Sequence, residues 1–241
     1  MEIQISVAKT NKFSSNESGD TLETVERPMG GVSVVLADAQ HSGKEAKIIS
    51  SMVVRKVISL LAEGVRDGAA ARAASDYLFT ERGGKESVCL NILSADFQTR
   101  TLVVSRNNPV PVFIAQRDNI ECISRDCPPI GNARNIRPLI TEIPLEPGTS
   151  VVMYTDGLAS AGESIGHQLD VCTTLRALME EQDPSADLIA DALLSQAIRL
   201  DQGRPEDDMS IIVLRVLSNV PDKIRRMKLR LPVEEEELQT Y

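Results

Sequence analysis

The sequence predicts an α+β protein, with antiparallel sheets at its centre and helices on the outside. The order of the segments supports this class, because a first group of strands, two helices, a long series of short strands, two helices and a last strand follow one another. Hydrophobic residues make up 42% of the 241 residues and aromatic residues only 3%. We therefore expect one domain with a largely aliphatic core, with or without an appendage.

The first part of the chain contains two predicted strands. Residues 2–9 alternate apolar and polar side chains, which is typical of a strand with one solvated face. A polar loop over residues 11–20 follows, and a Pro-Met-Gly-Gly turn over residues 28–31 leads into an apolar strand over residues 31–38.

Two helices are expected next. The segment Ser42-Gly43-Lys44-Glu45 fits a capping box, which predicts a helix over residues 45–62. Its polar residues form one narrow stripe that includes Lys47, so the helix should lie flat on a sheet. A second, alanine-rich helix is predicted over residues 67–80, before two glycines.

The rest of the domain is predicted from short apolar runs separated by turn residues. The expected strands are residues 87–93, 100–105, 111–116, 120–124, 139–143, 149–155 and 209–216, with helices at 169–181 and 184–200. Beyond residue 216, residues 223–233 alternate apolar and basic side chains. They predict either an extra edge strand or a tail that pairs with another chain.

Composition excludes several classes of protein. The net charge of −9 argues against a nucleic-acid partner, which requires a positive surface. No apolar run is long enough for a membrane helix and no signal peptide is present, so we expect a cytoplasmic protein without a membrane partner. A zinc site is not expected, because the cysteines lack metal-ligand spacing and suit free thiols: Cys89, Cys122, Cys127 and Cys172.

Three aspartates lie at the ends of predicted strands. Asp38 and Asp156 each follow an apolar run, and Asp207 precedes one. Antiparallel neighbours place the end of one strand beside the start of the next, so the three carboxylates can meet at one edge. Clustered carboxylates repel one another unless a cation neutralises them, and hard divalent ions prefer oxygen ligands. The pattern therefore predicts a metal site, which Asp20 can join from its loop.

Four carboxylates can hold two divalent ions. Such a pair generates hydroxide near neutral pH and stabilises both the attacking and the leaving oxygen in phosphoryl transfer. No nucleophilic side chain is then required. This agrees with the absence of a cysteine in a phosphate-binding glycine-rich loop and of a histidine in a recognisable triad.

Taken together, the motifs resemble those of the metal-dependent type 2C (PPM) protein serine/threonine phosphatases, in particular the bacterial sporulation stage II E-like branch. The resemblance covers about residues 1–217, in order. It rests on Ser18-Gly19-Asp20, on the segment from Ala37 to Ala46, on Tyr154-Thr155-Asp156-Gly157, on Asp207-Asp208-Met209-Ser210, on residues 102–114 and on Cys127-Pro128-Pro129-Ile130-Gly131.

The resemblance implies a four-layer αββα sandwich with a dimetal site at one end of its two antiparallel sheets. It implies two Mn²⁺ or Mg²⁺ ions and direct attack of a bridging hydroxide on phosphoserine or phosphothreonine. Asp38 would bridge both ions, Asp156 and Asp207 would bind one, and the Ala39 carbonyl and Asp20 would bind the other. Residues 1–217 would form the phosphatase domain and residues 218–241 a C-terminal extension with an acidic end.

Further residue roles and the substrate also follow from the resemblance. His41 is a candidate proton donor to the leaving serine, and Lys12 and Arg106 are candidates for binding the phosphate. The substrate would be a phosphorylated bacterial regulator, such as an anti-anti-sigma factor.

Two alternatives remain open from the sequence. The unusual loop after Asp38, with Ala39 where the family usually has glycine, suits a catalytically weak or inactive relative that binds a protein partner. A dimetal phosphoesterase or nuclease that acts on small molecules or nucleic acid is the second alternative, although the acidic composition disfavours nucleic acid.

Overall fold

The computed structural model describes residues 1–116, 119–181, 183–218, 222 and 224–232. Over these residues, the strands are β1 (Glu2–Thr10), β2 (Thr21–Glu26), β3 (Gly31–Ala39), β4 (Val88–Asp96), β5 (Thr101–Asn107), β6 (Val112–Gln116), β7 (Asn119–Ile123), β8 (Leu139–Pro144), β9 (Thr149–Tyr154) and β10 (Met209–Leu217). The helices are α1 (Lys44–Ala62), α2 (Asp67–Arg82), α3 (Asp156–Ala159), the 3₁₀ turn η1 (Glu163–Ile165), α4 (Val171–Glu181) and α5 (Ala186–Leu200).

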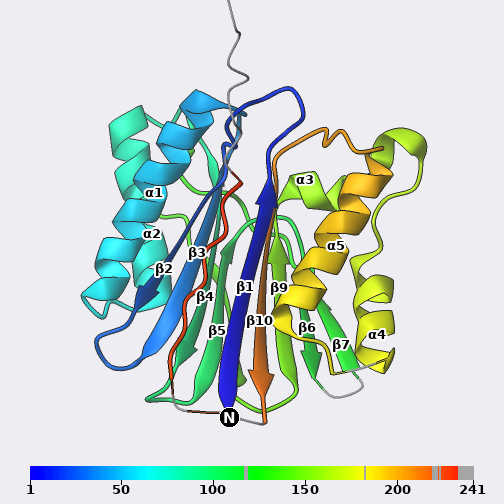
Figure 1. The fold of residues 1–241 in the computed structure, drawn as a ribbon. Helices are drawn as coiled ribbons and strands as arrows, with labels where there is room; N and C mark the ends of the chain where they lie inside the picture. Colours follow the sequence, from blue (N-terminus) through cyan, green and yellow to red (C-terminus); the bar gives the residue numbers. More distant parts are fainter. Residues whose placement is uncertain (117–118, 182, 219–221, 223, 233–241) are drawn as a thin grey trace, which may run out of the picture.

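The strands form two antiparallel five-stranded sheets that face each other (Figure 1). The strand order is β1-β10-β9-β6-β7 in the first sheet and β2-β3-β4-β5-β8 in the second. Helices α1 and α2 cover the outer face of the second sheet, and α4 and α5 cover that of the first. The predicted α+β class and the αββα sandwich implied by the resemblance are both confirmed.

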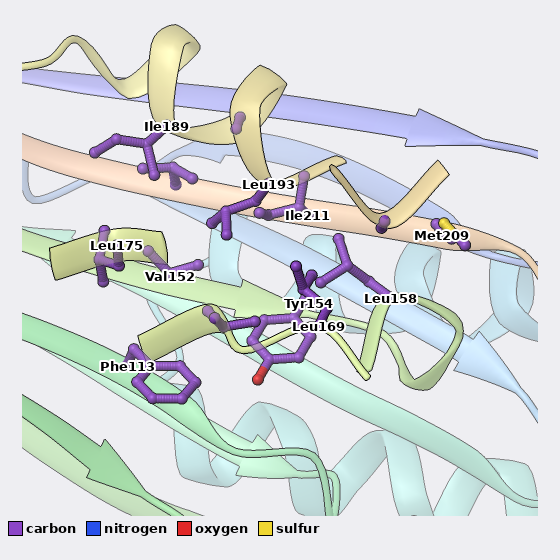
Figure 2. Packing of buried hydrophobic residues seen from close by; sticks show 14 of the residues in the cluster. Phe113, Val152, Tyr154, Leu158, Leu169, Leu175, Ile189, Leu193, Met209 and Ile211 are labelled. Carbon is purple, nitrogen blue, oxygen red and sulfur yellow. The ribbon is translucent and has the colours of Figure 1, made fainter. Parts of the chain in front are cut away.

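Three apolar clusters hold the four layers together. One lies between the sheets and is almost entirely aliphatic, as the composition predicted. A second packs α1 and α2 against the second sheet. The third packs α4 and α5 against the first sheet (Figure 2), where the stacked rings of Phe113 and Tyr154 lie 6.3 Å apart between centroids.

Strand register brings distant parts of the chain to one end of the sandwich. The start of β10 lies beside both the end of β1 (Thr10 opposite Met209) and the end of β9 (Tyr154 opposite Ile211). In the second sheet, Thr21 at the start of β2 pairs with Ala37 near the end of β3. We call this end of the molecule the acidic edge, because it carries Asp20, Asp38, Asp156 and Asp207.

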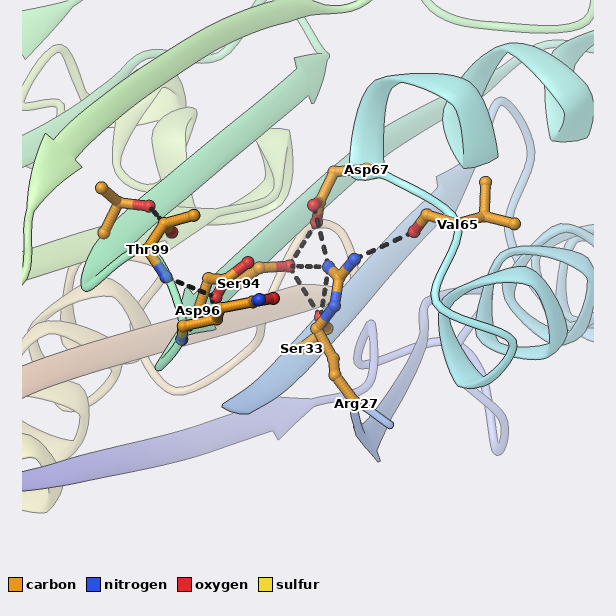
Figure 3. A network of polar contacts seen from close by, with 9 residues as sticks. Arg27, Ser33, Val65, Asp67, Ser94, Asp96 and Thr99 are labelled. Atoms are coloured by element: carbon orange, nitrogen blue, oxygen red, sulfur yellow. Dashed lines mark hydrogen bonds and ion pairs between the residues drawn. The ribbon is translucent and has the colours of Figure 1, made fainter. Parts of the chain in front are cut away.

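The opposite end of the second sheet is fixed by a buried polar network (Figure 3). The Arg27 guanidinium lies 2.9 Å from the Asp67 carboxylate and donates a 2.9 Å hydrogen bond to the Val65 carbonyl. Ser94 and Ser33 complete the network from β4 and β3. These bonds attach the connection between α1 and α2 to the sheet.

Two local predictions were wrong. Strand β2 was not expected, because Leu22 and Val25 do not follow the alternating pattern of a strand with one buried face. The capping box does not form either. Helix α1 begins at Lys44 with Gly43 as its N-cap residue, whose φ of 82° suits glycine, and no side chain of the described residues caps the helix.

The C-terminal segment and the helices bear on two further expectations. Residues 222 and 224–232 form no strand and are exposed, and the acidic run at 234–237 lies outside the described residues. All four cysteines are described and free, as expected. None of the described helices has both the length and the apolar character needed to cross a membrane.

Candidate metal centre

Asp20 is the most buried of the predicted metal ligands, with 1% of its surface exposed. Its Oδ2 accepts a 2.6 Å hydrogen bond from the Ser210 hydroxyl and a 3.3 Å hydrogen bond from the Thr155 hydroxyl. Its Oδ1 is equally buried and accepts no hydrogen bond within the described part of the chain. A buried carboxylate oxygen without a donor is costly, so this atom is suited to meeting a cation.

The backbone around Asp20 is held by residues of β1 and α1. The ammonium groups of Lys9 and Lys47 both donate to the Asp20 carbonyl, at 3.1 and 2.7 Å. The Ser50 hydroxyl of α1 donates to the Gly19 carbonyl at 2.5 Å. Lys47 therefore points from the supposed polar stripe of α1 into the site, and burial, followed by the charge of Lys9, lowers the pKa of its ammonium group.

Asp38 is half-buried near the end of β3, between Asp20 and Asp156. Burial, followed by the negative charges of Asp20 and Asp156, raises the pKa of Asp38 to about 10 from an ordinary value of 3.8. Burial is also the main cause that raises the pKa of Asp20 to about 7, with the Ser210 hydrogen bond opposing it. Without a cation, this site therefore favours protons on its carboxylates.

Asp156 and Asp207 complete the acidic edge from the first sheet. Asp156 is exposed and is the first residue of α3, directly after β9. Asp207 is half-buried just before β10, and burial, with a further contribution from the charge of Asp156, raises its pKa. Gly157 allows the two segments to meet, because a Cβ atom there would lie 2.2 Å from the Asp208 carbonyl oxygen.

Asp208 has a structural role in this arrangement. Its buried carboxylate accepts hydrogen bonds from the backbone amides of Lys12 and Gly19, at 2.9 and 2.7 Å. These bonds join the loop over residues 11–20 to the start of β10. A Cβ atom on Gly19 would lie 2.9 Å from that of Ala46, so glycine allows the loop to pass close to α1.

The oxygen donors at the acidic edge fit a hard divalent cation. Carboxylates, together with the backbone carbonyl of Ala39 at the end of β3, are ligand types that Mg²⁺ and Mn²⁺ prefer. Within the described residues, no three His, Cys, Asp or Glu side chains lie close enough to form a ready-made cage for one ion. The acids instead form a line of neighbours from Asp20 through Asp38 and Asp156 to Asp207.

Other predicted residues are placed differently. His41 is exposed just after β3, and among the described residues its side chain forms no hydrogen bond or ion pair with the acids. Lys12 is half-buried and its charge acts on Asp207. Arg106 is 1% exposed, and its guanidinium donates to the carbonyls of Val110 and Arg125. The prediction that Arg106 binds phosphate is therefore wrong, because its guanidinium is buried and already donates to two backbone carbonyls.

Sequence reasoning missed the residues that surround Asp20. Thr155 and Ser210 belong to the recognised motifs, but only the pairing of β9 with β10 shows that both hydroxyls reach Asp20. Lys9 lies at the end of its predicted strand and Lys47 in the polar stripe of its predicted helix, so nothing in the local sequence marks them as site residues. Their contact with one carbonyl depends on how β1, α1 and the loop over residues 11–20 pack.

Comparisons with known proteins agree with the observed fold. The family model described as stage II sporulation protein E (SpoIIE) matches residues 28–217. A stage II sporulation protein E from Bacillus subtilis (strain 168) is 23% identical over 205 residues, which cover 85% of this chain and 24% of that protein. The chain thus spans about a quarter of the length of that relative.

Solved structures share the fold. The PP2C phosphatase domain of SpoIIE from Bacillus subtilis, with a fragment of its regulatory domain, aligns with a TM-score of 0.76 at 20% identity, covering 90% of this chain and 64% of that one. The catalytic domain of the serine/threonine protein phosphatase PstP, in complex with two manganese ions, aligns with a TM-score of 0.68 at 15% identity, covering 90% and 99%.

The family match extends over most of the chain, and both sheets with their flanking helices correspond to those of PP2C phosphatase domains. The protein therefore belongs to the stage II sporulation protein E family.

Proposed function

We propose that this protein is a metal-dependent phosphatase that hydrolyses phosphoserine and phosphothreonine in a protein substrate. The observation that carries the proposal is the acidic edge, where aspartates from four segments of the chain form a line of neighbours that starts at Asp20, whose buried Oδ1 accepts no hydrogen bond from the described residues. The family and the shared PP2C fold support the same reaction.

In this proposal, two divalent ions would be held by Asp20, Asp38, Asp156, Asp207 and the Ala39 carbonyl, with Asp38 as a shared ligand. When bound, such ions supply an activated water and stabilise the charge of the transferred phosphoryl group. The protein supplies oxygen donors in fixed positions and draws them from both sheets. The manganese ions of the PstP structure support Mn²⁺ as one candidate ion. Mg²⁺ is the other candidate, because it also prefers oxygen ligands.

The cysteine nearest to the acids is unsuited to act as the nucleophile. Cys89 pairs with Asp38 across β3 and β4. Burial, followed by the charges of Asp38, Asp156 and Asp20, raises the pKa of the Cys89 thiol to about 12. A thiol is a weak nucleophile compared with its thiolate, so a phosphocysteine intermediate is disfavoured.

The substrate proposed from the resemblance is a phosphorylated regulatory protein of the anti-anti-sigma type. The net charge of −9 opposes nucleic acid as a substrate. A panel of phosphoserine, phosphothreonine and phosphotyrosine peptides, nucleotides and single-stranded DNA tests this choice. Preferential release of phosphate from the nucleotides or cleavage of the DNA would replace the proposal with the phosphoesterase or nuclease alternative.

Activity itself is tested with p-nitrophenyl phosphate and a phosphoserine peptide in Mn²⁺ and in Mg²⁺. We expect metal-dependent hydrolysis that falls by more than about 100-fold in Asp38→Asn, because even outer partners of metal ligands contribute 10- to 100-fold. Asp191→Asn, at an exposed position of α5, is the matched control and should keep full activity. Absence of turnover in the wild type would favour an inactive, partner-binding relative.

His41 is proposed as a proton donor to the leaving serine oxygen. Nitrophenolate leaves without a proton, whereas a serine alkoxide requires one. His41→Ala should therefore slow hydrolysis of the phosphoserine peptide by about 100-fold and leave hydrolysis of p-nitrophenyl phosphate nearly unchanged. Equal loss with both substrates would remove His41 from this role.

A further inference from the structure

We propose that the Ser210 hydroxyl, assisted by that of Thr155, is a positioning group that turns the Asp20 carboxylate so that Oδ1 faces the metal centre. This inference rests on the proposed function, because it assigns a second set of residues to the same site. Ser210 and Thr155 would not touch substrate or ion and would act through Asp20.

The two oxygens of Asp20 have unequal surroundings. Oδ2 receives the 2.6 Å hydrogen bond from Ser210 and the 3.3 Å hydrogen bond from Thr155. Oδ1 is fully buried and receives no hydrogen bond from the part of the chain that the structure describes. Since a carboxylate can rotate to exchange its oxygens, the two hydroxyls determine which oxygen remains free for a cation.

The hydroxyls themselves are fixed by the pairing of β9 with β10. The Ser210 amide donates to the Thr155 hydroxyl oxygen at 2.9 Å, and the Thr155 amide donates to the Ser210 carbonyl at 3.0 Å. The Thr155 hydroxyl also lies 3.4 Å from the Asp208 carbonyl, which competes for its proton. Ser210 is therefore the stronger of the two donors to Asp20.

The backbone of Asp20 is held separately, from the other side. Lys9 and Lys47 donate to its carbonyl, and Ser50 donates to the carbonyl of Gly19. With the main chain fixed by β1 and α1, the principal remaining freedom of Asp20 is rotation of its side chain. The hydroxyls from the first sheet restrict that rotation, so Asp20 is positioned by both halves of the sandwich.

In a purely structural role, Ser210 would only donate a hydrogen bond to the buried Asp20 carboxylate. That role predicts a loss of stability in Ser210→Ala without a specific effect on metal binding. The positioning role predicts weaker binding of Mn²⁺ in a protein that remains folded. The two roles are separated by measuring Mn²⁺ affinity by calorimetry and thermal unfolding of the ion-free protein side by side.

The experiment compares the wild-type chain of 241 residues with three variants. Ser210→Ala should bind Mn²⁺ about 10-fold more weakly, as is usual when an outer partner of a metal ligand is lost. Ser210→Thr keeps the hydroxyl and should restore affinity to within about twofold of the wild type. Ser150→Ala is the matched control, because it removes a fully buried hydroxyl of β9 that has no hydrogen-bond partner among the described residues, and it should bind like the wild type.

A double variant tests whether Ser210 acts through Asp20. In an Asp20→Asn background, Ser210→Ala should have no further effect on Mn²⁺ affinity, because the carboxylate that it orients is absent. An undiminished further loss in that background would overturn the inference, as would wild-type affinity in folded Ser210→Ala. Absence of Mn²⁺ binding by the wild type would instead overturn the proposed function.

Discussion

At the scale of single residues, the carboxylates of the acidic edge are held where they cannot all be charged. Asp20 and Asp38 are partly or fully removed from water, and their raised pKa values have burial as the leading cause. A divalent cation would reverse this preference by stabilising the ionised forms. The same residues therefore make the ion-free protein sensitive to pH and responsive to metal.

The pH dependence of stability has a definite sign. In the ion-free folded state, Asp20 and Asp38 hold protons up to about pH 7 and about pH 10, whereas their ordinary pKa is 3.8. The folded state thus binds more protons than the unfolded state above about pH 4, and the stability from these groups is lost as the pH rises. We expect the thermal midpoint without metal to fall by on the order of 5 °C between pH 5 and pH 8.

Two comparisons test whether these aspartates cause the slope of the thermal midpoint against pH. Asp38→Asn should flatten it, because the amide does not titrate. Mn²⁺ should raise the midpoint more at pH 8 than at pH 5, since binding must displace protons. A midpoint that rises with pH in the ion-free wild type, or a slope unchanged in Asp38→Asn, would contradict this account.

Gly157 provides a second test at the scale of one residue. Its neighbour is the backbone of Asp208, so the 2.2 Å approach of an added Cβ cannot be relieved by turning a side chain. Gly157→Ala should lower the free energy of unfolding in urea by about 1–3 kcal/mol and weaken Mn²⁺ binding by separating Asp156 from Asp207.

A second glycine substitution is the control for Gly157→Ala. An added Cβ on Gly68 in α2 would meet the flexible end of the exposed Ile140 side chain. Gly68→Ala should therefore be neutral or slightly stabilising, because alanine favours the helix. Wild-type stability and metal affinity in Gly157→Ala would show that the close approach is unimportant.

At the scale of elements, helix α1 is joined to the second sheet at both ends. Near its start, Lys47 and Ser50 contact the backbone around Asp20. Beyond its end, the Arg27 and Asp67 pair holds the turn into α2 (Figure 3). The start of the helix therefore positions the backbone around Asp20, and the network beyond its end stabilises the fold.

This division predicts that stability and metal binding can be separated. Asp67→Asn leaves the buried Arg27 guanidinium without its carboxylate, so it should cost about 3 kcal/mol in urea unfolding. Mn²⁺ affinity in the folded variant should stay within about twofold of the wild type, since Ser33 and Asp38 mark opposite ends of β3. Asp222→Asn, which breaks an exposed ion pair, should change neither property. A large loss of metal affinity in Asp67→Asn would show that the two ends of α1 are coupled.

Most elements were predictable because their apolar patterns are strong. The sequence indicated α1, β3, β9 and β10 within one or two residues, and with them the positions of the strand-end aspartates. It did not indicate β2, whose residues lack alternation, or the short helix α3 after β9. Such elements form because neighbouring strands and turns hold them, which is information beyond a local pattern.

At the scale of the whole molecule, the acidic edge exists because two sheets pack face to face. Asp20 and Asp38 belong to the second sheet and its preceding loop, whereas Asp156 and Asp207 belong to the first. The sequence predicted this set of acids from strand ends. It could not predict the hydroxyls and lysines that orient Asp20, because those contacts depend on side-chain packing between layers.

The C-terminal segment lies outside this packing. Figure 1 shows residues 224–232 running along the side where the edge strands β1 and β2 lie, and Arg225 contacts Glu26 at 3.3 Å with both side chains exposed. Exposed pairs contribute little to stability. We propose residues 1–217 as the catalytic domain, so a chain that ends after Ser218 should keep its activity and a thermal midpoint within about 2 °C. Loss of folding would place the segment within the domain.

The central claim is that aspartates from four segments of the chain form one dimetal centre. The most direct measurement is anomalous diffraction from crystals of the protein grown with Mn²⁺. We predict two manganese peaks between the side chains of Asp20, Asp38, Asp156 and Asp207, with Oδ1 of Asp20 turned toward them. Peaks elsewhere on the molecule, or none at saturating Mn²⁺, would contradict the claim.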